Sequence, residues 1–366
     1  MNRADEKYMQ MALRLARRGI GSVEPNPAVG CVIVKNNKIV GKGWHKKFGG
    51  PHAEINALEN CKESPRGATM YVTLEPCCHF GKTPPCTDAI IKAGIKKIVA
   101  AIKDPTKKVN GKGFRILKRA GIKVATGLCK NEAEKLNAAF FKFAGTGNPW
   151  VIIKWAQSAD GFLARKDKKR WITGPKSKKD AHRLRRQVQG ILVGINTVIA
   201  DDPLLTARPG KGRKPVRIVV DSFLKTPLNC KLLTTAKKIP VLIATSEKMI
   251  TSKPRKVREI IEKGAELLAV PAKRGNLDLR VLLKELAERG IAQLLVEGGA
   301  KTITSFLRHR LADEVRIYIA PKKLGKFGSV NITRPMAKLA QTTGLRYADT
   351  ERFGDDVRIK GLLKTR

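Results

Sequence analysis

The sequence predicts an α/β protein of two domains, on the evidence of its length, its alternating helix and strand patterns, and a change in composition near the middle. The chain has 366 residues, whereas a domain has roughly 150. Several segments read as a helical stretch, a glycine stop and a short β-rich run, which is typical of α/β folds. We therefore expect domains at residues 1–147 and 150–366, with residues 145–149, which contain glycine and proline, as the linker.

The first half begins with an amphipathic pattern and continues as alternating helices and strands. Residues 1–19 mix charged and apolar residues like an amphipathic helix and lack the apolar stretch of a secretory signal. Further on, a helical stretch at 89–94 leads into a strand at 97–102. Another helical stretch at 116–121 leads into a strand at 122–125. This order predicts a sheet covered by helices.

The second half repeats this alternation. A strand-like run at 150–155 follows the linker, and a helical stretch at 286–290 leads into a strand at 291–296. Gly298-Gly299 then precedes a helical stretch at 301–310. Free backbone N–H groups at such a helix start attract phosphate, although a simple glycine turn has the same pattern. The chain has neither a G-x-G-x-x-G fingerprint nor a P-loop.

Composition and charge exclude several classes of protein. Hydrophobic residues make up 42% and charged residues 29%, as in folded globular chains. The longest apolar runs are far shorter than the roughly 18 residues that span a bilayer. The net charge of +43 is spread evenly, as +16 over residues 1–149 and +27 over 150–366. Aromatic residues, at 5%, offer few platforms for stacking bases.

We interpret this charge as a solvated surface that favours phosphorylated small molecules. We expect a cytoplasmic protein that acts on a phosphorylated small molecule, forms a homo-oligomer, and binds neither a membrane nor nucleic acid.

Residue types that bind metals gather in the first half. Three of the seven cysteines lie within residues 77–86, which indicates metal binding or catalysis more than a disulfide framework. His52 and Glu54 form a His-x-Glu motif, and Pro76-Cys77 and then Cys86 follow a strand-like run. This order of motifs is typical of the zinc nucleobase deaminases. The sequence therefore predicts one Zn²⁺ per chain, held by His52, Cys77 and Cys86.

The predicted ligands suit zinc catalysis. Three protein ligands leave a fourth position open for a water molecule, whose pKa the ion lowers to about 7. Cys86 opens a helical stretch at 87–93, and the positive end of a helix lowers the pKa of a thiol. Glu54 lies two residues from His52, where it could take a proton from the water and pass it to a leaving amine.

The spacing of the cysteines leaves alternatives open. Eight residues separate Cys77 from Cys86, whereas the usual motif has two. Cys78 and His79 are therefore possible ligands in place of Cys86. The cysteines could also be buried small hydrophobes without a metal.

Longer motifs in both halves occur in the order found in one known family. Along the chain they are residues 25–34, 73–86, 154–161, 171–174, 197–206, 208, 221–222 and 296–301. Together they resemble the bifunctional RibD family of riboflavin biosynthesis, a pyrimidine deaminase fused to a reductase. The resemblance implies a cytidine-deaminase-like α/β/α domain followed by a dihydrofolate-reductase-like α/β domain.

The resemblance also implies two reactions. The first is zinc-dependent deamination of 2,5-diamino-6-ribosylamino-4(3H)-pyrimidinone 5′-phosphate. The second is NADPH-dependent reduction of 5-amino-6-(5-phosphoribosylamino)uracil to its ribityl product. By motif, NADPH would contact Ala156, Trp171, Thr197, Asp201, Ser222, Gly299, Ala300, Lys301, Thr302, Ile303, Thr304 and Ser305. The substrate of the reduction would contact Lys169, Arg185, Leu205, Arg208 and Glu297.

The residue types are consistent with these implied roles. Arg185 and Arg208 offer guanidinium forks that suit a 5′-phosphate. We expect Lys154, in a strand, and Asp201, after one, to position the substrate or transfer a proton during reduction. Trp171 is also typical of a core residue, because it lies between a strand and a helix.

Two other functions are compatible with parts of the sequence. One is a nucleic-acid base deaminase with a basic C-terminal binding domain, which the net charge would suit. The other is a binding protein with a relict zinc site, but Glu54 would then have no role. Binding of NADPH is expected of the fused deaminase and reductase but not of the nucleic-acid base deaminase, so it distinguishes the two.

Overall fold

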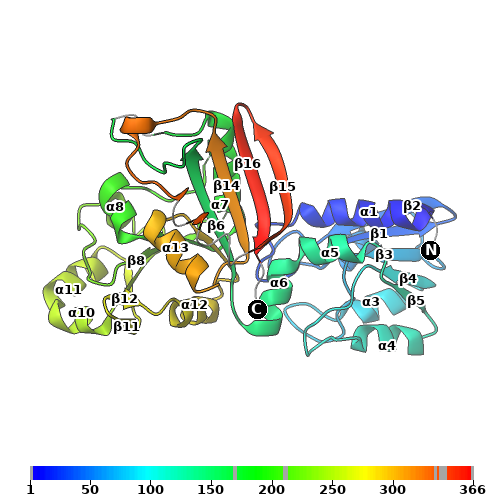
Figure 1. Cartoon of the computed structure of the whole chain (residues 1–366). Helices are drawn as coiled ribbons and strands as arrows, with labels where there is room; N and C mark the ends of the chain where they lie inside the picture. Colours follow the sequence, from blue (N-terminus) through cyan, green and yellow to red (C-terminus); the bar gives the residue numbers. More distant parts are fainter. Residues whose placement is uncertain (1–2, 168–170, 209–212, 334–335, 338–343, 364–366) are drawn as a thin grey trace. The chain divides into compact units, whose positions relative to one another are not determined.

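The chain divides into two compact units, Met1–Gly147 and Asn148–Arg366. The computed structural model describes residues 3–167, 171–208, 213–333, 336–337 and 344–363. Each unit is built on one main sheet with helices beside it (Figure 1). Within the described residues, no helix combines the length and apolar character needed to cross a membrane.

Unit 1 contains six helices and five strands in its described part. The helices are α1 (Arg3–Arg17), α2 (Ala53–Glu59), α3 (Cys86–Lys92), α4 (Lys112–Arg119), α5 (Lys130–Leu136) and α6 (Ala138–Thr146). The strands are β1 (Gly30–Lys35), β2 (Lys38–Trp44), β3 (Thr69–Val72), β4 (Lys97–Ala100) and β5 (Lys123–Thr126).

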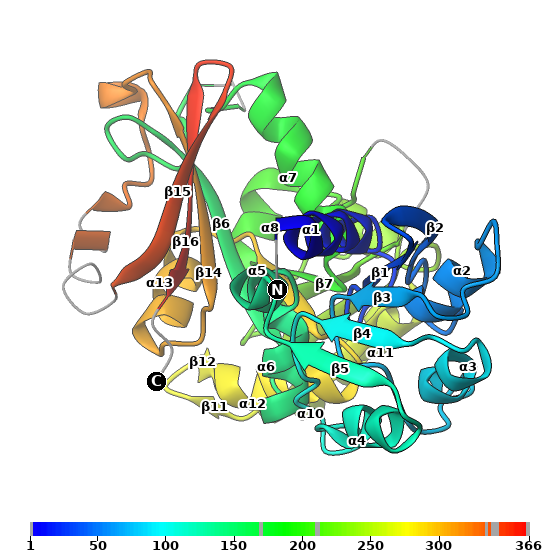
Figure 2. The same ribbon diagram turned by 90° about the vertical axis from the view of Figure 1, so that its right-hand side faces the viewer.

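The sheet of unit 1 has the order β2-β1-β3-β4-β5. β1 is antiparallel to β2 and β3, and the remaining pairs are parallel. Successive residues of a strand point to opposite faces, so Cys31 and Ile33 pack in one core with α2 and α3, whereas Val32 and Val34 pack in another with α1. Figure 2 shows α1 on one face and α2, α3 and α4 on the other. This confirms the predicted three-layer α/β/α arrangement.

Helix α2 lies unusually close to strand β2. A Cβ atom at Gly43 would lie 2.3 Å from the backbone nitrogen of Ala57 and 2.5 Å from the carbonyl oxygen of Ala53. Only glycine allows this approach. The close contact sets the position of the helix that carries Glu54.

Unit 2 contains the remaining elements. Its helices are α7 (Pro175–Gln187), α8 (Ile195–Asp201), α9 (Lys231–Thr234), α10 (Glu247–Ser252), α11 (Pro254–Glu262), α12 (Leu279–Glu288), α13 (Ala300–Arg308) and the short 3₁₀ turn η1 (Gly325–Phe327). Its strands are β6 (Trp150–Ser158), β7 (Gly190–Gly194), β8 (Val216–Val220), β9 (Val241–Thr245), β10 (Glu266–Ala269), β11 (Ala272–Lys273), β12 (Asn276–Leu277), β13 (Gln293–Val296), β14 (Glu314–Ala320), β15 (Leu345–Phe353) and β16 (Asp356–Leu363).

The main sheet of unit 2 has the order β10-β9-β8-β7-β13-β6-β14-β16-β15. The strands from β10 to β14 in this order are parallel, whereas β16 and β15 are antiparallel to their neighbours. Ile153 faces a core shared with α12 and α13, and Ile152 faces the opposite core, shared with α7 and α11. The parallel strands therefore end together at one edge, where ligands of α/β folds usually bind.

The linker predicted at residues 145–149 is wrong in its first part. Helix α6 continues to Thr146 and ends at Gly147, which has a positive φ of 66°. Phe140 and Phe141 pack against the core of unit 1 and extend the helix past the point that composition alone indicated. The predicted strand start at Trp150 is confirmed.

Candidate active sites

His52, Cys77 and Cys86 come together in unit 1. Their ligand atoms all lie within 4.8 Å of one another. His52 Nδ1 is 3.4 Å from Cys77 Sγ and 3.4 Å from Cys86 Sγ. His52 precedes α2 as its N-cap, and Cys86 is the first residue of α3. In the part of the chain that the structure describes, no other group of histidine, cysteine or acidic residues has this geometry.

The spacing of these atoms fits a zinc ion. Zinc bonds of about 2.3 Å to sulfur and about 2.0 Å to nitrogen, in tetrahedral geometry, place the sulfur and nitrogen atoms about 3.5 Å apart. The two observed distances of 3.4 Å agree with this value. The donor set of one imidazole and two thiolates is also one that zinc prefers.

The two cysteines differ in their acidity. A hydrogen bond with Cys86 lowers the pKa of Cys77, and His52 lowers it further. The backbone N–H of Cys86 also donates to Cys77 Sγ, at 3.3 Å. The same interaction with Cys77, together with burial, raises the pKa of Cys86, contrary to the lowering expected from its position at a helix start. Cys77 is therefore the thiol that ionises first, and metal binding would release the proton of Cys86.

Glu54 is buried beside this group. Its residue is 3% exposed, and burial, with Cys77 nearby, raises the pKa of its carboxyl to about 7. A group that titrates near neutral pH can both accept and return a proton. Its position on the first turn of α2 directs it to the cavity that His52 and Cys77 also line.

His52, Glu54 and Cys77 line a cavity of ≈ 290 Å³. Its polar lining includes His79, one of the alternative ligands, and seven residues that the sequence did not indicate as binding residues: Asn26, His45, Lys82, Thr83, Asp104, Thr106 and Lys108. His45 Nδ1 is 3.0 Å from the carbonyl oxygen of Pro51, and its Nε2 is 3.3 Å from Asn26 Nδ2. The rarity of histidine could have identified His45 as a candidate from the sequence, because the chain has only 5 histidines.

The alternative ligands lie elsewhere. Cys78 Sγ is 3.9 Å from the carbonyl oxygen of Lys108, and Cys78 is not part of the group. His79 forms part of the cavity wall. The structure thus groups Cys86, and neither alternative, with His52 and Cys77.

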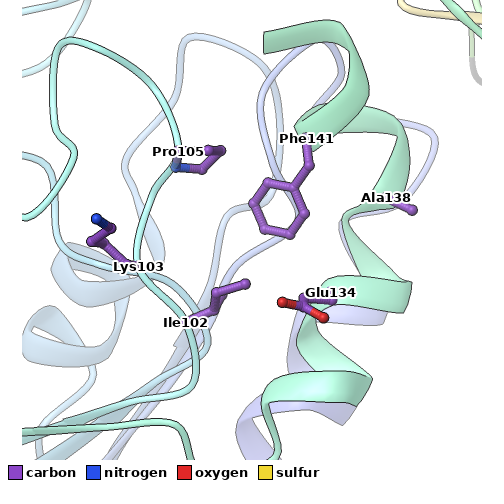
Figure 3. Close-up of a pocket in the computed structure, with 6 residues that line it drawn as sticks. All are labelled: Ile102, Lys103, Pro105, Glu134, Ala138 and Phe141. Carbon is purple, nitrogen blue, oxygen red and sulfur yellow. The ribbon is translucent and has the colours of Figure 1, made fainter. Parts of the chain in front are cut away.

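A second cavity of unit 1, of ≈ 420 Å³, is lined by other residues. It lies between the loop after β4 and helices α5 and α6, and the ring of Phe141 faces Ile102 across it (Figure 3). Its other lining residues are Lys103, Pro105, Glu134 and Ala138. None of them is among the residues that the sequence predicts for a site.

In unit 2, several residues predicted to bind the cofactor gather at the carboxyl edge of the parallel strands. Thr197 lies in α8, which follows β7, and Ser222 follows β8. Gly299 is the N-cap of α13, which follows β13, and its N–H donates to Thr197 Oγ1 at 3.2 Å. Ala156 lies in the neighbouring strand β6. These strand ends form the edge where the fold predicts a ligand.

The predicted segment 300–305 forms the first turns of α13. Its residues are Ala300, Lys301, Thr302, Ile303, Thr304 and Ser305. Ile303 is fully buried in the hydrophobic core, so its side chain faces away from any ligand at the edge. Gly299 has no side chain to cap the first-turn N–H groups, which leaves them suited to phosphate oxygens.

The surroundings of Trp171 and Asp201 differ from the sequence prediction. Trp171 is 53% exposed, with Lys178 Nζ 4.1 Å from its ring centre, so the core interpretation is wrong. Asp201 does not directly follow a strand, because α8 intervenes and Asp201 is its exposed last residue. Lys169 lies outside the described residues.

Arg185 and Glu297, both predicted to bind substrate, pair with each other. Arg185 Nε and Nη2 donate to Glu297 Oε1 and Oε2, at 3.0 and 2.5 Å, and Nη1 donates to the carbonyl oxygen of Thr206, at 3.1 Å. Burial alone would raise the pKa of Glu297, but Arg185 and Lys154 lower it to about 2. Burial lowers the pKa of Lys154, which Glu297 partly opposes. These electrostatic effects indicate that Lys154 lies near the pair.

The segment that carries Leu205 and Arg208 lies beside this pair. Leu205 is buried with a positive φ of 50°. The backbone N–H of Arg208 donates to Nδ1 of His182 in α7, at 3.2 Å, and Arg208 itself is exposed. The structure therefore brings all the predicted substrate residues that it describes into one region of unit 2.

Comparisons with known proteins match both units. Residues 2–102 match the cytidine and deoxycytidylate deaminase zinc-binding region, and residues 149–359 match the RibD C-terminal domain. The second match favours the predicted reductase over a nucleic-acid binding domain.

Relatives match over nearly the whole chain. The riboflavin biosynthesis protein RibD of Aquifex aeolicus is 43% identical over 358 residues, which cover 97% of each chain. A structure of Acinetobacter baumannii RibD is 36% identical and superimposes with a TM-score of 0.86 over 99% of each chain. The crystal structure of a diaminohydroxyphosphoribosylaminopyrimidine deaminase/5-amino-6-(5-phosphoribosylamino)uracil reductase from Thermotoga maritima is 34% identical, with a TM-score of 0.85 and coverage of 99% of each chain. The chain therefore belongs to the RibD family of riboflavin biosynthesis proteins.

Proposed function

We propose that the protein catalyses two steps of riboflavin biosynthesis. Unit 1 hydrolyses the exocyclic amine of 2,5-diamino-6-ribosylamino-4(3H)-pyrimidinone 5′-phosphate to ammonia. Unit 2 then reduces the ribosyl group of 5-amino-6-(5-phosphoribosylamino)uracil to ribityl with NADPH. The observation that carries this proposal is the group of His52, Cys77 and Cys86 in a RibD-family chain, with Glu54 lining the same cavity as His52 and Cys77.

In unit 1, His52, Cys77 and Cys86 would hold one Zn²⁺. The ion would supply Lewis acidity, which makes a water molecule nucleophilic at neutral pH. Glu54 takes the proton of the attacking water and returns it to the departing amine, a role that suits its raised pKa.

The cavity of unit 1 suits a small phosphorylated substrate. Lys82 and Lys108 supply positive charge for the phosphate, and Asn26 and His45 supply hydrogen-bonding groups for the base. His45 is held by its own hydrogen bonds to Asn26 and Pro51, so the wall next to His52 is ordered before substrate binds.

In unit 2, NADPH would lie across the carboxyl edge of the parallel strands and supply the hydride. Its phosphates would meet the N–H groups at the start of α13, and Thr197 and Ser222 would line the same edge. Lys154 and Asp201 would position the substrate or transfer the proton that accompanies the hydride. Exposed Arg208 is the better partner for the 5′-phosphate, because the fork of Arg185 is already engaged by Glu297.

A coupled assay on the purified protein tests both steps. Ammonia release from the diaminopyrimidinone phosphate, followed by oxidation of NADPH, is the expected result. Removal of zinc with a chelator should stop ammonia release but leave reduction of separately supplied deaminated substrate intact. Ammonia release without NADPH oxidation would remove the reductase proposal, and deamination of oligonucleotides alone would favour a nucleic-acid base deaminase.

A further inference from the structure

We infer that Glu75 is a positioning residue for deamination, whose buried carboxylate holds the loop of residues 104–111 in place next to Cys77. This inference rests on the deaminase function proposed above and assigns a role to a residue that neither binds the metal nor moves a proton.

Both oxygens of the Glu75 carboxylate accept hydrogen bonds from backbone N–H groups. Glu75 is 3% exposed and lies two residues before Cys77. Its Oε2 accepts from the N–H groups of Asp104, at 3.2 Å, and Gly111, at 2.9 Å. Its Oε1 accepts from the N–H of Phe114, at 3.3 Å. Because both oxygens are engaged in this way, the carboxylate is suited to positioning and not to proton transfer.

These contacts make Glu75 the cap of a helix that is distant in sequence. Gly111 is the N-cap of α4 and has no side chain of its own to satisfy the first-turn N–H groups. Glu75 accepts from the N-cap residue and from the third residue of the helix, and its negative charge lies at the positive end of the helix. The helix start is therefore attached to the segment that leads into Cys77.

The attached loop forms part of the wall of the cavity. Asp104, Thr106, Lys108 and Val109 all line it. Glu75 binds the N–H groups near the two ends of this loop, and the side chain of Asp104 holds its interior by accepting from the N–H of Thr106, at 2.7 Å. One carboxylate thus sets the distance between the loop side chains and the group of His52, Cys77 and Cys86.

The packing of α4 supports the same conclusion independently. A Cβ atom at Gly113 would lie 2.3 Å from the carbonyl oxygen of Pro76, the residue between Glu75 and Cys77. This distance is too short for any side chain, so the first turn of α4 presses directly on the backbone beside Cys77. A methyl group at this position would separate the loop from Cys77 without changing any charge.

Two variants test the inference, Glu75→Gln and Gly113→Ala, with Glu59→Gln as the control for an exposed carboxylate on α2. Zinc content, the kcat and KM of ammonia release, and NADPH-dependent reduction are measured on each purified full-length protein. We expect both variants to retain zinc and reduction, and to lose about tenfold or more in kcat/KM of deamination, chiefly through KM. Glu59→Gln should match the wild type.

The Gly113→Ala variant separates positioning from helix stability. Alanine is a better helix former than glycine, but its methyl group would clash with the backbone of Pro76, so a purely structural role predicts a lower unfolding temperature with unchanged KM. Wild-type KM in both variants would overturn the inference, as would loss of zinc from Glu75→Gln, because Glu75 would then serve the metal ligands alone. Absence of ammonia release from the wild type would instead refute the proposed function.

Discussion

The candidate sites of the two units differ in how their residues are assembled. In unit 1, three donor atoms from residues 52–86 lie within 4.8 Å of one another. In unit 2, the candidate residues come from the ends of several parallel strands and span residues 154–305. A metal needs particular donor atoms, which leave a short pattern of unusual residues in the sequence. A cofactor site at the edge of a sheet needs a suitable backbone geometry and small residues. Small residues are common throughout the chain, so such a site leaves no distinctive sequence pattern.

Each unit also contains a buried glutamate, and the pKa values of the two carboxyl groups are shifted in opposite directions. Burial raises the pKa of Glu54 to about 7. Burial acts on Glu297 in the same direction, but Arg185 and Lys154 outweigh it and lower its pKa to about 2. The comparison shows that the neighbouring cations decide the role of a buried carboxylate. Glu54 is suited to proton transfer, whereas Glu297 stays ionised and holds other groups in place.

The largest expected effect is on the metal group of unit 1. Cys86→Ala removes one of three donors, so we expect zinc and ammonia release to be lost while reduction by unit 2 persists. Cys78→Ala is the matched control and should retain zinc. Metal content after dialysis checks both variants. Full zinc occupancy in Cys86→Ala would move the third ligand to Cys78 or His79.

A smaller effect is expected from the exposed arginine of unit 2. Arg208→Ala should raise the KM for the phosphorylated substrate of the reduction about 10- to 100-fold, because a charged hydrogen bond contributes about 1.5–3 kcal/mol. Its unfolding temperature should not change, whereas Arg185→Ala should lower it by leaving Glu297 buried without its partner. Steady-state kinetics and thermal unfolding distinguish the two arginines. Equal KM values for Arg208→Ala and the wild type would remove Arg208 from the phosphate site.

The third expected effect concerns stability and leaves unit 1 unchanged. Glu297→Gln should destabilise unit 2 by about 3 kcal/mol at neutral pH, because it leaves the Arg185 guanidinium unpaired. The pKa of Glu297 is lowered on folding from 4.5 to about 2, so the carboxylate stabilises the fold above pH 4.5 and this contribution is lost as the pH falls towards 2.

Thermal unfolding across this pH range checks the sign of the effect. The Tm difference between the wild type and Glu297→Gln should be largest at neutral pH and shrink below pH 4.5. Glu285→Gln, which breaks an exposed pair with Arg289, should change Tm little at any pH. A difference that does not depend on pH would contradict the assignment of an ionised, paired Glu297.

The α/β class and the metal donors could be predicted from the sequence because both produce local sequence patterns. Helix and strand periods alternate visibly along the chain, and the His-x-Glu and Pro-Cys motifs need few residues. The sequence alone could not predict contacts between residues that are far apart in the chain and belong to common residue types. The pairing of Arg185 with Glu297 and the capping of α4 by Glu75 join residues 112 and 36 or more positions apart. The extension of α6 into the first part of the predicted linker depended on the packing of Phe140 and Phe141 against the core of unit 1.

We propose that one chain carries two chemically separate active sites. The most direct test assays both steps in Glu54→Gln and in Lys154→Met. We expect Glu54→Gln to retain zinc, to lose deamination by about 10²–10⁴-fold, and to reduce supplied deaminated substrate at the wild-type rate. Lys154→Met should release ammonia normally and fail in reduction. Loss of both activities in each zinc-loaded variant would contradict the account.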